Sequence, residues 1–405
     1  MNMLSRLRRR LVVVGNGMAG ARALEEVLVH APGQFDITVF GAEPHGSYNR
    51  IMLSPVLAGE TRFADIVTHD AAWYAENGIE LIAGEAVAGI DRTTRMVHGA
   101  CGTTRSYDVL LLATGSVPVM LPVPGAELPG VFSFRDIADV VAMRQSCRAG
   151  GRAVVIGGGL LGLEAAHGLH RNGMEVTVVH LMSSLMERQL DGMSAALLAQ
   201  AIEARGITVL TTASTTALAG EDRVTGVVLA DGSTIPAEII VMAAGVRPNI
   251  ALARSAGLEC GRGVRVDDTM CTSDPSIYAI GECVEHRGIV VGLVAPIWAM
   301  AQAFAQHIAG DPDARYAASA VGTHLKVSGI DTYSAGDFLG DDASEAISFR
   351  DIAHGVHRRL VLRDDRLVGI AMVGDARDSG WYFDLLRRGT DVSTMRDTLA
   401  FGMAA

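Results

Sequence analysis

The sequence predicts an α/β protein built from two similar three-layer units and a small C-terminal α+β domain. Three observations lead to this prediction. The chain has 405 residues, which is too long for one ordinary domain. A pattern of buried strand, glycine-rich turn and helix occurs twice, and residues 316–405 alternate short strands with a closing helix.

The first unit begins with Leu11–Val14, an apolar run that is typical of a buried parallel strand. Three glycines follow in the spacing Gly-x-Gly-x-x-Gly, namely Gly15, Gly17 and Gly20. A helix is expected at 21–28, a second strand at 36–40, and then Glu43 stands where an acidic residue binds an adenosine ribose. Such a turn brings the backbone and a helix N-terminus close to a pyrophosphate, so the pattern predicts a Rossmann-like dinucleotide-binding unit. A glycine turn that serves packing alone is the alternative.

The first unit continues through several shorter elements. We expect a polar turn running into a short helix at 44–55, a helix at 70–77, a strand at 79–83, a hairpin within 90–107, and a buried strand from 108 that ends in Ala113-Thr114-Gly115. Prolines and a glycine between 118 and 125 then indicate a linker.

The second unit repeats this order of elements. We expect a strand at 153–156, the turn Gly157-x-Gly159-x-x-Gly162, a helix from 163, strands at 175–179, 207–210 and 223–229, a helix at 193–205, and a closing strand from 239 that ends at Gly245. Two complete units in one chain are far more specific than one. We interpret them as sites for a bound flavin in the first unit and a nicotinamide cofactor in the second.

The last third of the chain completes the domain plan. Residues 246–315 contain a strand that leads into Gly281 and Glu282, followed by an apolar helix near 295–309. We therefore predict three domains, with these boundaries: a discontinuous FAD-binding domain at 1–117 and 246–315, an NAD(P)H-binding domain at 118–245, and a C-terminal α+β interface domain at 316–405.

Net charge, the length of apolar runs and cysteine spacing exclude several classes of protein. The net charge of −11 argues against nucleic acid as a partner, and no apolar run approaches the length of a membrane span. None of the five cysteines forms Cys-x-x-Cys, so we expect no metal site, no iron–sulfur cluster and no closely spaced redox disulfide. Scattered cysteines in odd number favour a reducing compartment, and we expect a cytoplasmic protein.

The motifs together resemble a known family. Two Gly-x-Gly-x-x-Gly units, an Ala-Thr-Gly sequence between them and a late Gly-Glu resemble the two-dinucleotide-domain FAD/NAD(P)H flavoprotein reductases, which include glutathione, ferredoxin and rubredoxin reductases. The similarity is strongest to the flavoprotein part of the NAD(P)H nitrite reductase large subunit and to electron-transfer subunits of assimilatory nitrate reductases. The stretches that carry it are 14–20, 38–44, 180–191, 281–283 and 292–296.

The resemblance implies roles for single residues. Glu282 would bind the ribityl chain of the flavin, and Arg50 would be a basic group near it. Trp298–Gln302 resembles the helix start that ferredoxin reductases direct at the flavin ring, with Trp298 at the ring edge or simply a core residue. Glu164 would bond the nicotinamide carboxamide, although a first-turn helix acid is stabilised by the dipole in any case. Ser54 stands near the position where many relatives carry a lysine.

The choice between NADH and NADPH is expected to depend on the end of the second strand of the second unit. An acidic residue there favours NAD and an arginine favours NADP. This chain has His180, and by resemblance we favour NADH, with NADPH left open. The expected catalytic residues are Arg50, Glu164 and Trp298. The residues expected to contact the cofactors are Gly15, Gly17, Met18, Ala19, Gly20, Glu43, Arg50, Ala113, Thr114, Gly115, Gly157, Gly159, Leu160, Leu161, Gly162, Glu164, His180, Gly245, Gly281 and Glu282.

The resulting expectation is an FAD-dependent NAD(P)H oxidoreductase that takes hydride from NADH and passes electrons singly to a separate redox partner in nitrate or nitrite assimilation. That partner would be a small iron–sulfur carrier or the catalytic subunit of a nitrate or nitrite reductase. The resemblance leaves two alternatives: a rubredoxin or ferredoxin reductase serving an oxygenase, and an NADH-sensing flavoprotein that switches partners. A homo-oligomer is also left open. Without the cysteine clusters of a nitrite-reducing centre, we expect no nitrite reduction by the chain alone.

Overall fold

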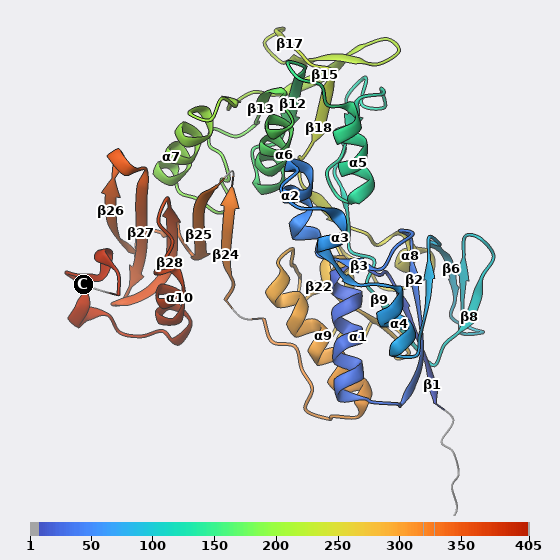
Figure 1. Cartoon of the computed structure of the whole chain (residues 1–405). Helices are drawn as coiled ribbons and strands as arrows, with labels where there is room; N and C mark the ends of the chain where they lie inside the picture. The colour runs from blue at the N-terminus through green and yellow to red at the C-terminus, as the bar shows by residue number, and fades with distance from the viewer. Residues whose placement is uncertain (1–7, 319, 328, 404–405) are drawn as a thin grey trace, which may run out of the picture. The chain divides into compact units, whose positions relative to one another are not determined.

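The computed structural model describes residues 8–318, 320–327 and 329–403, and its contacts divide the chain into two compact units (Figure 1). The first unit contains the described residues within 1–52, 62–117 and 246–319. The second contains 53–61, 118–245 and the described residues within 320–405. Each unit is considered by itself below.

The first unit is organised around a five-stranded parallel sheet. Its strands, in spatial order, are β21 (Ile277–Ala279), β9 (Val109–Leu112), β1 (Arg9–Val14), β2 (Phe35–Gly41) and β5 (Ile79–Ala83). Helices α1 (Met18–His30) and α9 (Val294–Ala309) pack against each other (Figure 1). Chain order reverses at β1, between β2 and β9, and this switch point is where open α/β sheets bind their ligands.

Smaller elements surround this sheet. The segment expected to be a hairpin within 90–107 is a three-stranded antiparallel sheet, because the chain turns back twice: β6 (Val87–Asp91), β7 (Met96–Gly99) and β8 (Thr104–Ser106). The other elements of this unit are β3 (Ser47–Tyr48), η1 (Arg50–Met52), α3 (Phe63–Ile66), β4 (Val67–His69), α4 (Ala71–Glu76), α8 (Ala251–Ser255), β20 (Val264–Val266), η2 (Gly281–Cys283), β22 (Val284–His286) and β23 (Ile289–Val290).

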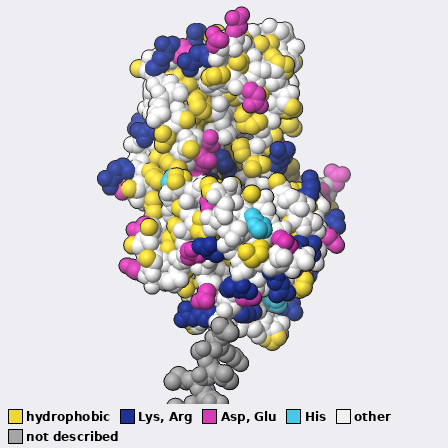
Figure 2. Space-filling model, turned by 90° about the vertical axis from the view of Figure 1, so that its right-hand side faces the viewer, with side chains coloured by type: hydrophobic (Ala, Val, Ile, Leu, Met, Phe, Trp, Pro, Cys, Tyr) yellow, Lys and Arg dark blue, Asp and Glu magenta, His cyan; other side chains and the backbone are white. Residues whose placement is uncertain are grey.

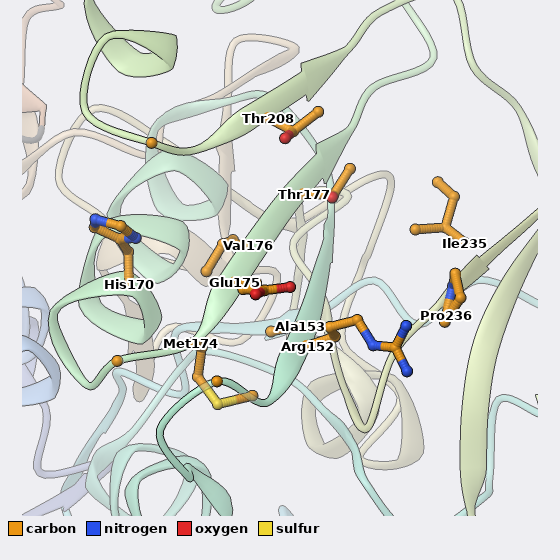
Figure 3. A pocket seen from close by; sticks show the side chains of 13 residues that line it. Arg152, Ala153, His170, Met174, Glu175, Val176, Thr177, Thr208, Ile235 and Pro236 are labelled. Atoms are coloured by element: carbon orange, nitrogen blue, oxygen red, sulfur yellow. The ribbon is translucent and has the colours of Figure 1, made fainter.

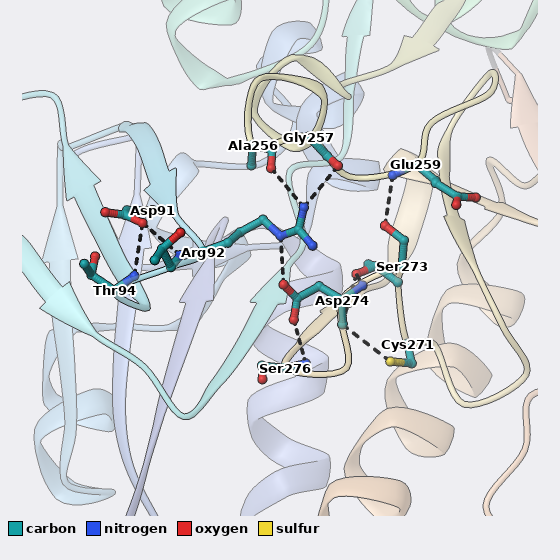
Figure 4. A network of polar contacts seen from close by, with 12 residues as sticks. Asp91, Arg92, Thr94, Ala256, Gly257, Glu259, Cys271, Ser273, Asp274 and Ser276 are labelled. Carbon is teal, nitrogen blue, oxygen red and sulfur yellow. Dashed lines mark hydrogen bonds and ion pairs between the residues drawn. The ribbon is translucent and has the colours of Figure 1, made fainter.

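A polar network joins distant parts of the first unit. Arg92, at the turn after β6, donates from Nε to Asp274 Oδ2 at 2.8 Å and from Nη1 to the carbonyl of Gly257 at 3.2 Å (Figure 4). The Asp274 carboxylate also accepts from the backbone N–H of Ser276 at 3.0 Å. These bonds tie the antiparallel sheet to the segment between α8 and β21.

The second unit repeats the parallel plan. Its five strands, in spatial order, are β11 (Val131–Phe132), β18 (Ile239–Met242), β12 (Arg152–Ile156), β13 (Glu175–Val179) and β14 (Thr208–Leu210). Its helices are α2 (Leu53–Ala58), α5 (Ile137–Ser146), α6 (Leu160–Arg171) and α7 (Gly192–Glu203), and a small antiparallel sheet is formed by β15 (Thr215–Gly220), β16 (Val224–Leu229) and β17 (Thr234–Pro236). Two short strands that lie almost entirely in the first unit, β10 (Ser116–Pro118) and β19 (Val246–Pro248), pair with each other.

The C-terminal part is an antiparallel sheet with its own core. The strands are β24 (Gly322–Val327), β25 (Ile330–Gly336), β28 (Arg366–Val373), β27 (Val356–Arg363) and β26 (Glu345–Asp351), in that spatial order. Helix α10 (Ser379–Arg388) packs on β28, and the single-turn helices η3 (Ile352–His354), η4 (Ser393–Met395) and η5 (Leu399–Phe401) complete it. Leu360, Ile370 and Tyr382 are fully buried in this core. The predicted α/β fold class with a small C-terminal α+β part is confirmed.

Two further observations concern the length of the helices and the charges on one face of the surface. Among the described residues, no helix combines the length and apolar character needed to cross a bilayer. On the face drawn in Figure 2, basic and acidic side chains are interspersed instead of being gathered into a basic stripe.

Candidate functional site

The three glycines of the first turn differ in how much space surrounds them. A Cβ atom on Gly15 would lie 2.2 Å from the carbonyl oxygen of Ala113, and one on Gly20 would lie 2.1 Å from that of Gly15. These two positions are therefore fixed by packing. A Cβ on Gly17 would meet nothing closer than the Arg50 guanidinium, at 3.7 Å from Nε. The free space above Gly17 is what a pyrophosphate needs in order to approach the backbone.

The second glycine turn repeats this geometry. A Cβ on Gly157 would lie 2.2 Å from the carbonyl oxygen of Ala243, and one on Gly162 would lie 2.0 Å from that of Gly157, whereas Gly159 has no atom of the described structure within 4 Å of that position. Helices α1 and α6 begin at Met18 and Leu160, directly after the open glycines, so their first N–H groups face the free space. Both turns thus fit a dinucleotide and not only a packing role.

A cavity of about 450 Å³ adjoins the first turn. It lies at the carboxyl ends of β1 and β2, and its lining includes Val14, Gly15, Phe40, Ala42, Thr114 and Asn249. Asn16, within the turn, accepts a hydrogen bond from Tyr74 Oη at 2.6 Å, but its buried Nδ2 has no partner among the described residues. Because buried donors are almost always paired, this unmatched N–H is a further sign that the turn is built around a ligand.

Glu43 and Arg50 come together at the same turn. One carboxylate oxygen of Glu43 accepts from the Arg50 guanidinium, and the other accepts from Tyr48 Oη at 2.7 Å. Arg50 also lies over the Tyr48 ring, 5.2 Å from its centre. The structure therefore joins two residues that the sequence named separately, and it adds Tyr48, which sequence reasoning missed. The Tyr48-Asn-Arg50 spacing in a two-residue strand gave no periodic signal that could have identified it.

The late Gly-Glu motif approaches the first turn from another segment. Gly281 has a φ of +86°, and a Cβ there would lie 2.9 Å from the Cβ of Ala19 at the start of α1. Glu282 Oε2 accepts from Ser116 Oγ at 2.7 Å, directly after the Ala-Thr-Gly sequence. Thr114 donates from Oγ1 to the carbonyl of Asn249 at 2.7 Å. The expected residues of the first site thus surround one turn, and Ser116 and Asn249 are partners that the sequence did not indicate.

Trp298 requires a correction. The apolar helix expected near 295–309 is α9 (Val294–Ala309), but Trp298–Gln302, which resembles a helix start in relatives, lies one turn inside it. The apolar run before Trp298 continues the helix backwards, since Pro296 and Ile297 are buried and Pro is well tolerated in a first turn. The half-buried Trp298 ring lies 5.8 Å from the Arg22 guanidinium of α1. Its redox role stays a prediction.

In the second unit, Glu164 is held by a residue far away in the sequence. Ser54, on α2, donates from Oγ to Glu164 Oε2 at 2.6 Å. Burial raises the pKa of the Glu164 carboxyl to about 7, and the hydrogen bond from Ser54 acts in the opposite direction. α2 is fixed to α6 at a second point, where Asn172 Nδ2 donates to the carbonyl of Leu57 at 2.7 Å. The carboxyl group beside the second glycine turn is therefore desolvated and oriented.

His180 lies directly after β13, as expected, but it is 8% exposed and faces the glycine turn. Its Nδ1 accepts from the backbone N–H of Gly158 at 3.0 Å, and its Nε2 lies 3.1 Å from Glu187 Oε2. Gly245, which ends the closing strand, has open space around its Cβ position, and Leu161 at the start of α6 is partly exposed. The expected residues of the second unit therefore also gather at one end of its sheet.

A second cavity, of about 650 Å³, lies at the opposite end of that sheet (Figure 3). Its lining includes Arg152, Ala153, Glu175 and Thr208, which stand at the amino ends of β12, β13 and β14. Parallel sheets bind dinucleotides at their carboxyl ends, so this cavity is separate from the glycine turn. Among the described residues, no group of three or more His, Cys, Asp or Glu side chains is placed to hold a metal ion, and all five cysteines are free.

Comparisons with known proteins agree with this geometry. Residues 9–305 match the family model described as pyridine nucleotide-disulphide oxidoreductase, and residues 322–390 match the rubredoxin NAD+ reductase C-terminal domain. The chain is 46% identical to nitrite reductase (NAD(P)H) from Bacillus subtilis (strain 168), covering 95% of this chain and 48% of that protein. It is 45% identical to the assimilatory nitrate reductase electron transfer subunit of the same organism, covering 95% of this chain and 50% of that protein. The chain thus spans about half the length of these curated relatives.

Solved structures give the same result. The crystal structure of the ferredoxin reductase for the CYP199A2 system from Rhodopseudomonas palustris superimposes with a TM-score of 0.85 at 29% identity, covering 93% of this chain and 95% of that chain. The crystal structure of NADH:rubredoxin oxidoreductase from Clostridium acetobutylicum gives a TM-score of 0.80 at 25% identity, covering 98% of this chain and 99% of that chain. The predicted resemblance to two-dinucleotide-domain flavoprotein reductases is confirmed. With residues 9–305 matched, the chain belongs to the pyridine nucleotide-disulphide oxidoreductase family.

Proposed function

We propose that this chain is an FAD-dependent NAD(P)H oxidoreductase that takes hydride from NADH and delivers electrons singly to a separate redox protein in nitrate or nitrite assimilation. The observation that carries the proposal is the open second glycine in both turns, at Gly17 and Gly159. Two dinucleotide cradles in one chain suit an enzyme that holds one cofactor and exchanges another. The names of the Bacillus subtilis relatives support the assignment to nitrate or nitrite metabolism.

FAD is assigned to the first unit. When bound, it supplies the conversion of a two-electron hydride into single electrons. The N–H groups that open α1 would bind its pyrophosphate, and Arg50 would add a positive charge beside Gly17. Glu43 would accept from the adenosine ribose and Glu282 from the ribityl chain. Asn16 Nδ2 is a further donor without a protein partner among the described residues.

The nicotinamide cofactor is assigned to the second unit. The N–H groups at the start of α6 would bind its pyrophosphate above Gly159, and Glu164 would orient the carboxamide. We further propose that residues 118–245 and 316–405 are separate domains, because each has its own hydrophobic core. The domain at 316–405 would serve as an interface for the redox partner. The absence of disulfides between described cysteines supports a cytoplasmic location.

The partner is proposed to be a small iron–sulfur carrier or the catalytic subunit of a nitrate or nitrite reductase. A second candidate function has its own support, because the match of residues 322–390 is to a rubredoxin reductase domain. Under that reading the chain serves a rubredoxin or ferredoxin of an oxygenase. A third reading is an NADH-sensing flavoprotein with slow turnover.

The main experiment measures the FAD and iron content of the purified chain and its rate of NADH oxidation with different electron acceptors. We expect one FAD per chain, negligible iron, and rapid NADH oxidation with ferricyanide. With nitrite or nitrate as the sole acceptor, NADH consumption should not exceed the reaction with oxygen, and adding the catalytic partner or its iron–sulfur carrier should restore it. Stoichiometric iron, or ammonium formed from nitrite by the iron-free chain, contradicts the proposal.

Two further measurements separate the alternatives. Turnover with ferricyanide below roughly 0.1 per second favours the sensing role, since enzymes of this kind usually turn over at about 1 to 10³ per second. Parallel assays with rubredoxin, a [2Fe-2S] ferredoxin and the nitrite reductase partner then compare kcat/KM for the three carriers. The carrier with the highest value identifies the physiological class of acceptor.

A further inference from the structure

We infer that Glu187, and not His180, recognises the adenosine ribose of the nicotinamide cofactor and disfavours NADPH, with His180 as the residue that positions it. This inference rests on the proposed function. It names the residue that decides specificity at the second glycine turn.

The first step concerns His180, which occupies the usual ribose-reading position after β13. Its side chain is 9% exposed, and its ring fills the space beside Gly158, where a Cβ would lie 2.7 Å from the ring Cγ. Nδ1 accepts from the Gly158 N–H at 3.0 Å. The backbone N–H of His180 is also bound, to the carbonyl of Leu210 at 2.8 Å. His180 is therefore a fixed structural part of the turn and is not available to a ribose.

The second step concerns the tautomer. Because Nδ1 of His180 accepts a hydrogen bond, the ring proton of this tautomer stands on Nε2, which lies 3.1 Å from Glu187 Oε2. His180 Nε2–H therefore donates to Glu187 and orients its carboxylate. A carboxylate oxygen that accepts one bond keeps a second lone pair, and the other oxygen keeps two. Glu187 thus remains able to accept from both hydroxyls of a ribose.

The third step concerns the loop that carries Glu187. Met186 has a φ of +51°, which is uncommon for a residue with a side chain. Its backbone N–H donates to the carbonyl of Gly158 at 3.0 Å, and the Leu185 side chain packs beside Gly158. The left-handed turn at Met186 brings Glu187 back toward His180. Two hydrogen bonds to Gly158, one from its N–H to His180 Nδ1 and one from the Met186 N–H to its carbonyl, therefore hold the loop and the His180 ring on the glycine turn, with the Glu187 carboxylate against that ring.

The fourth step concerns charge. The side chain of Glu187 is 32% exposed, so a ligand at the turn can reach it. Its negative charge matches a 2′-hydroxyl, which donates, and repels a 2′-phosphate. Arg188, the next residue, is exposed and is the alternative residue for recognising the ribose, because an arginine there would favour the 2′-phosphate of NADPH. The hydrogen bonds around Gly158 and from His180 hold Glu187, whereas among the described residues Arg188 makes no hydrogen bond or ion pair that would hold it at the turn.

The experiment uses the full chain with FAD bound. Its ligands are two probes that lack nicotinamide and the two complete nicotinamide cofactors. Titration calorimetry compares the Kd of ADP-ribose with that of its 2′-phosphate derivative, and steady-state turnover with ferricyanide compares kcat/KM for NADH and NADPH. In Glu187→Gln, the preference for ADP-ribose and for NADH should fall by about tenfold or more, since one charge-assisted hydrogen bond is lost and the repulsion is removed. Glu187→Asp, which keeps the charge on a shorter side chain, should retain part of the preference.

The matched control is Glu175→Gln, which makes the same chemical change at the exposed amino end of β13, the strand that leads into His180. It should leave both ratios unchanged. An unchanged ratio in Glu187→Gln, or a tenfold change in Arg188→Gln instead, overturns the inference while leaving the proposed function standing. If the unaltered chain binds neither probe and NADH does not bleach the flavin, the proposed function itself fails.

Discussion

The desolvated carboxyl group of Glu164, a residue of intermediate exposure, gives a prediction whose size follows from the structure. Burial raises its pKa to about 7, from the ordinary value of 4.5 for a glutamate. Since one pKa unit corresponds to about 1.4 kcal/mol, the ionised form of Glu164 costs the folded state about 3 kcal/mol at high pH. Replacing Glu164 by Gln keeps the shape of the side chain and removes the charge at every pH.

The sign of the effect follows from proton binding. At pH values below 4.5 the carboxyl is protonated in both the folded and unfolded chains, and it contributes nothing. Between 4.5 and about 7 the unfolded chain loses this proton and the folded chain keeps it, so the free energy of unfolding falls as pH rises. Glu164→Gln should therefore gain stability relative to the unaltered chain, by about 3 kcal/mol between roughly pH 4.5 and pH 8.

The assay is urea unfolding with saturating FAD, followed by circular dichroism, at about pH 5 and about pH 8 for both proteins. Glu175→Gln is again the control, since that carboxylate is exposed and should show no such pH-dependent gain. Ser54→Ala should shift the pKa of Glu164 further upward, because its hydroxyl favours the ionised carboxylate. An equal stability difference between Glu164→Gln and the unaltered chain at both pH values would refute the desolvation argument.

Two further predictions concern the glycine turn and a helix cap. Gly17→Ala should keep the melting temperature of the FAD-free protein but lower its FAD content, because the new Cβ meets only Arg50. Gly20→Ala should lower the melting temperature itself, because its Cβ would lie 2.1 Å from the carbonyl oxygen of Gly15. Equal melting temperatures for the two variants would contradict this. Asp191 caps α7, and although burial opposes its ionisation, the His357 ring, whose Nε2 lies 3.5 Å from Oδ2, and the hydrogen bond from Ser194 Oγ hold its pKa at about 2. The stability that this carboxylate contributes is present above pH 3.8 and is lost as pH falls toward 2, so Asp191→Asn should be less stable at neutral pH and show a flatter acid limb in urea unfolding.

The sequence by itself determined the two dinucleotide units and the family. Each unit is defined by a strand, a glycine turn and a helix within one contiguous stretch, such as Arg9–Val14 followed by Met18–His30. Signals of this kind are local, because the periodicity of buried residues and the need for glycine at close contacts act between neighbours in the chain. For the same reason the strands expected at 79–83 and 175–179 are observed with those bounds, as β5 and β13.

Only the tertiary structure decided which side chains meet. Ser54 and Glu164 are 110 residues apart, and no periodic pattern connects a hydroxyl on one short helix with a carboxyl on another. The pairing of Glu43 with Arg50 and of His180 with Glu187 likewise depends on loop conformations, including the left-handed Met186. Hydrogen bonds of this kind form only after packing has fixed the backbone, so their partners are set by three-dimensional position and not by spacing along the chain.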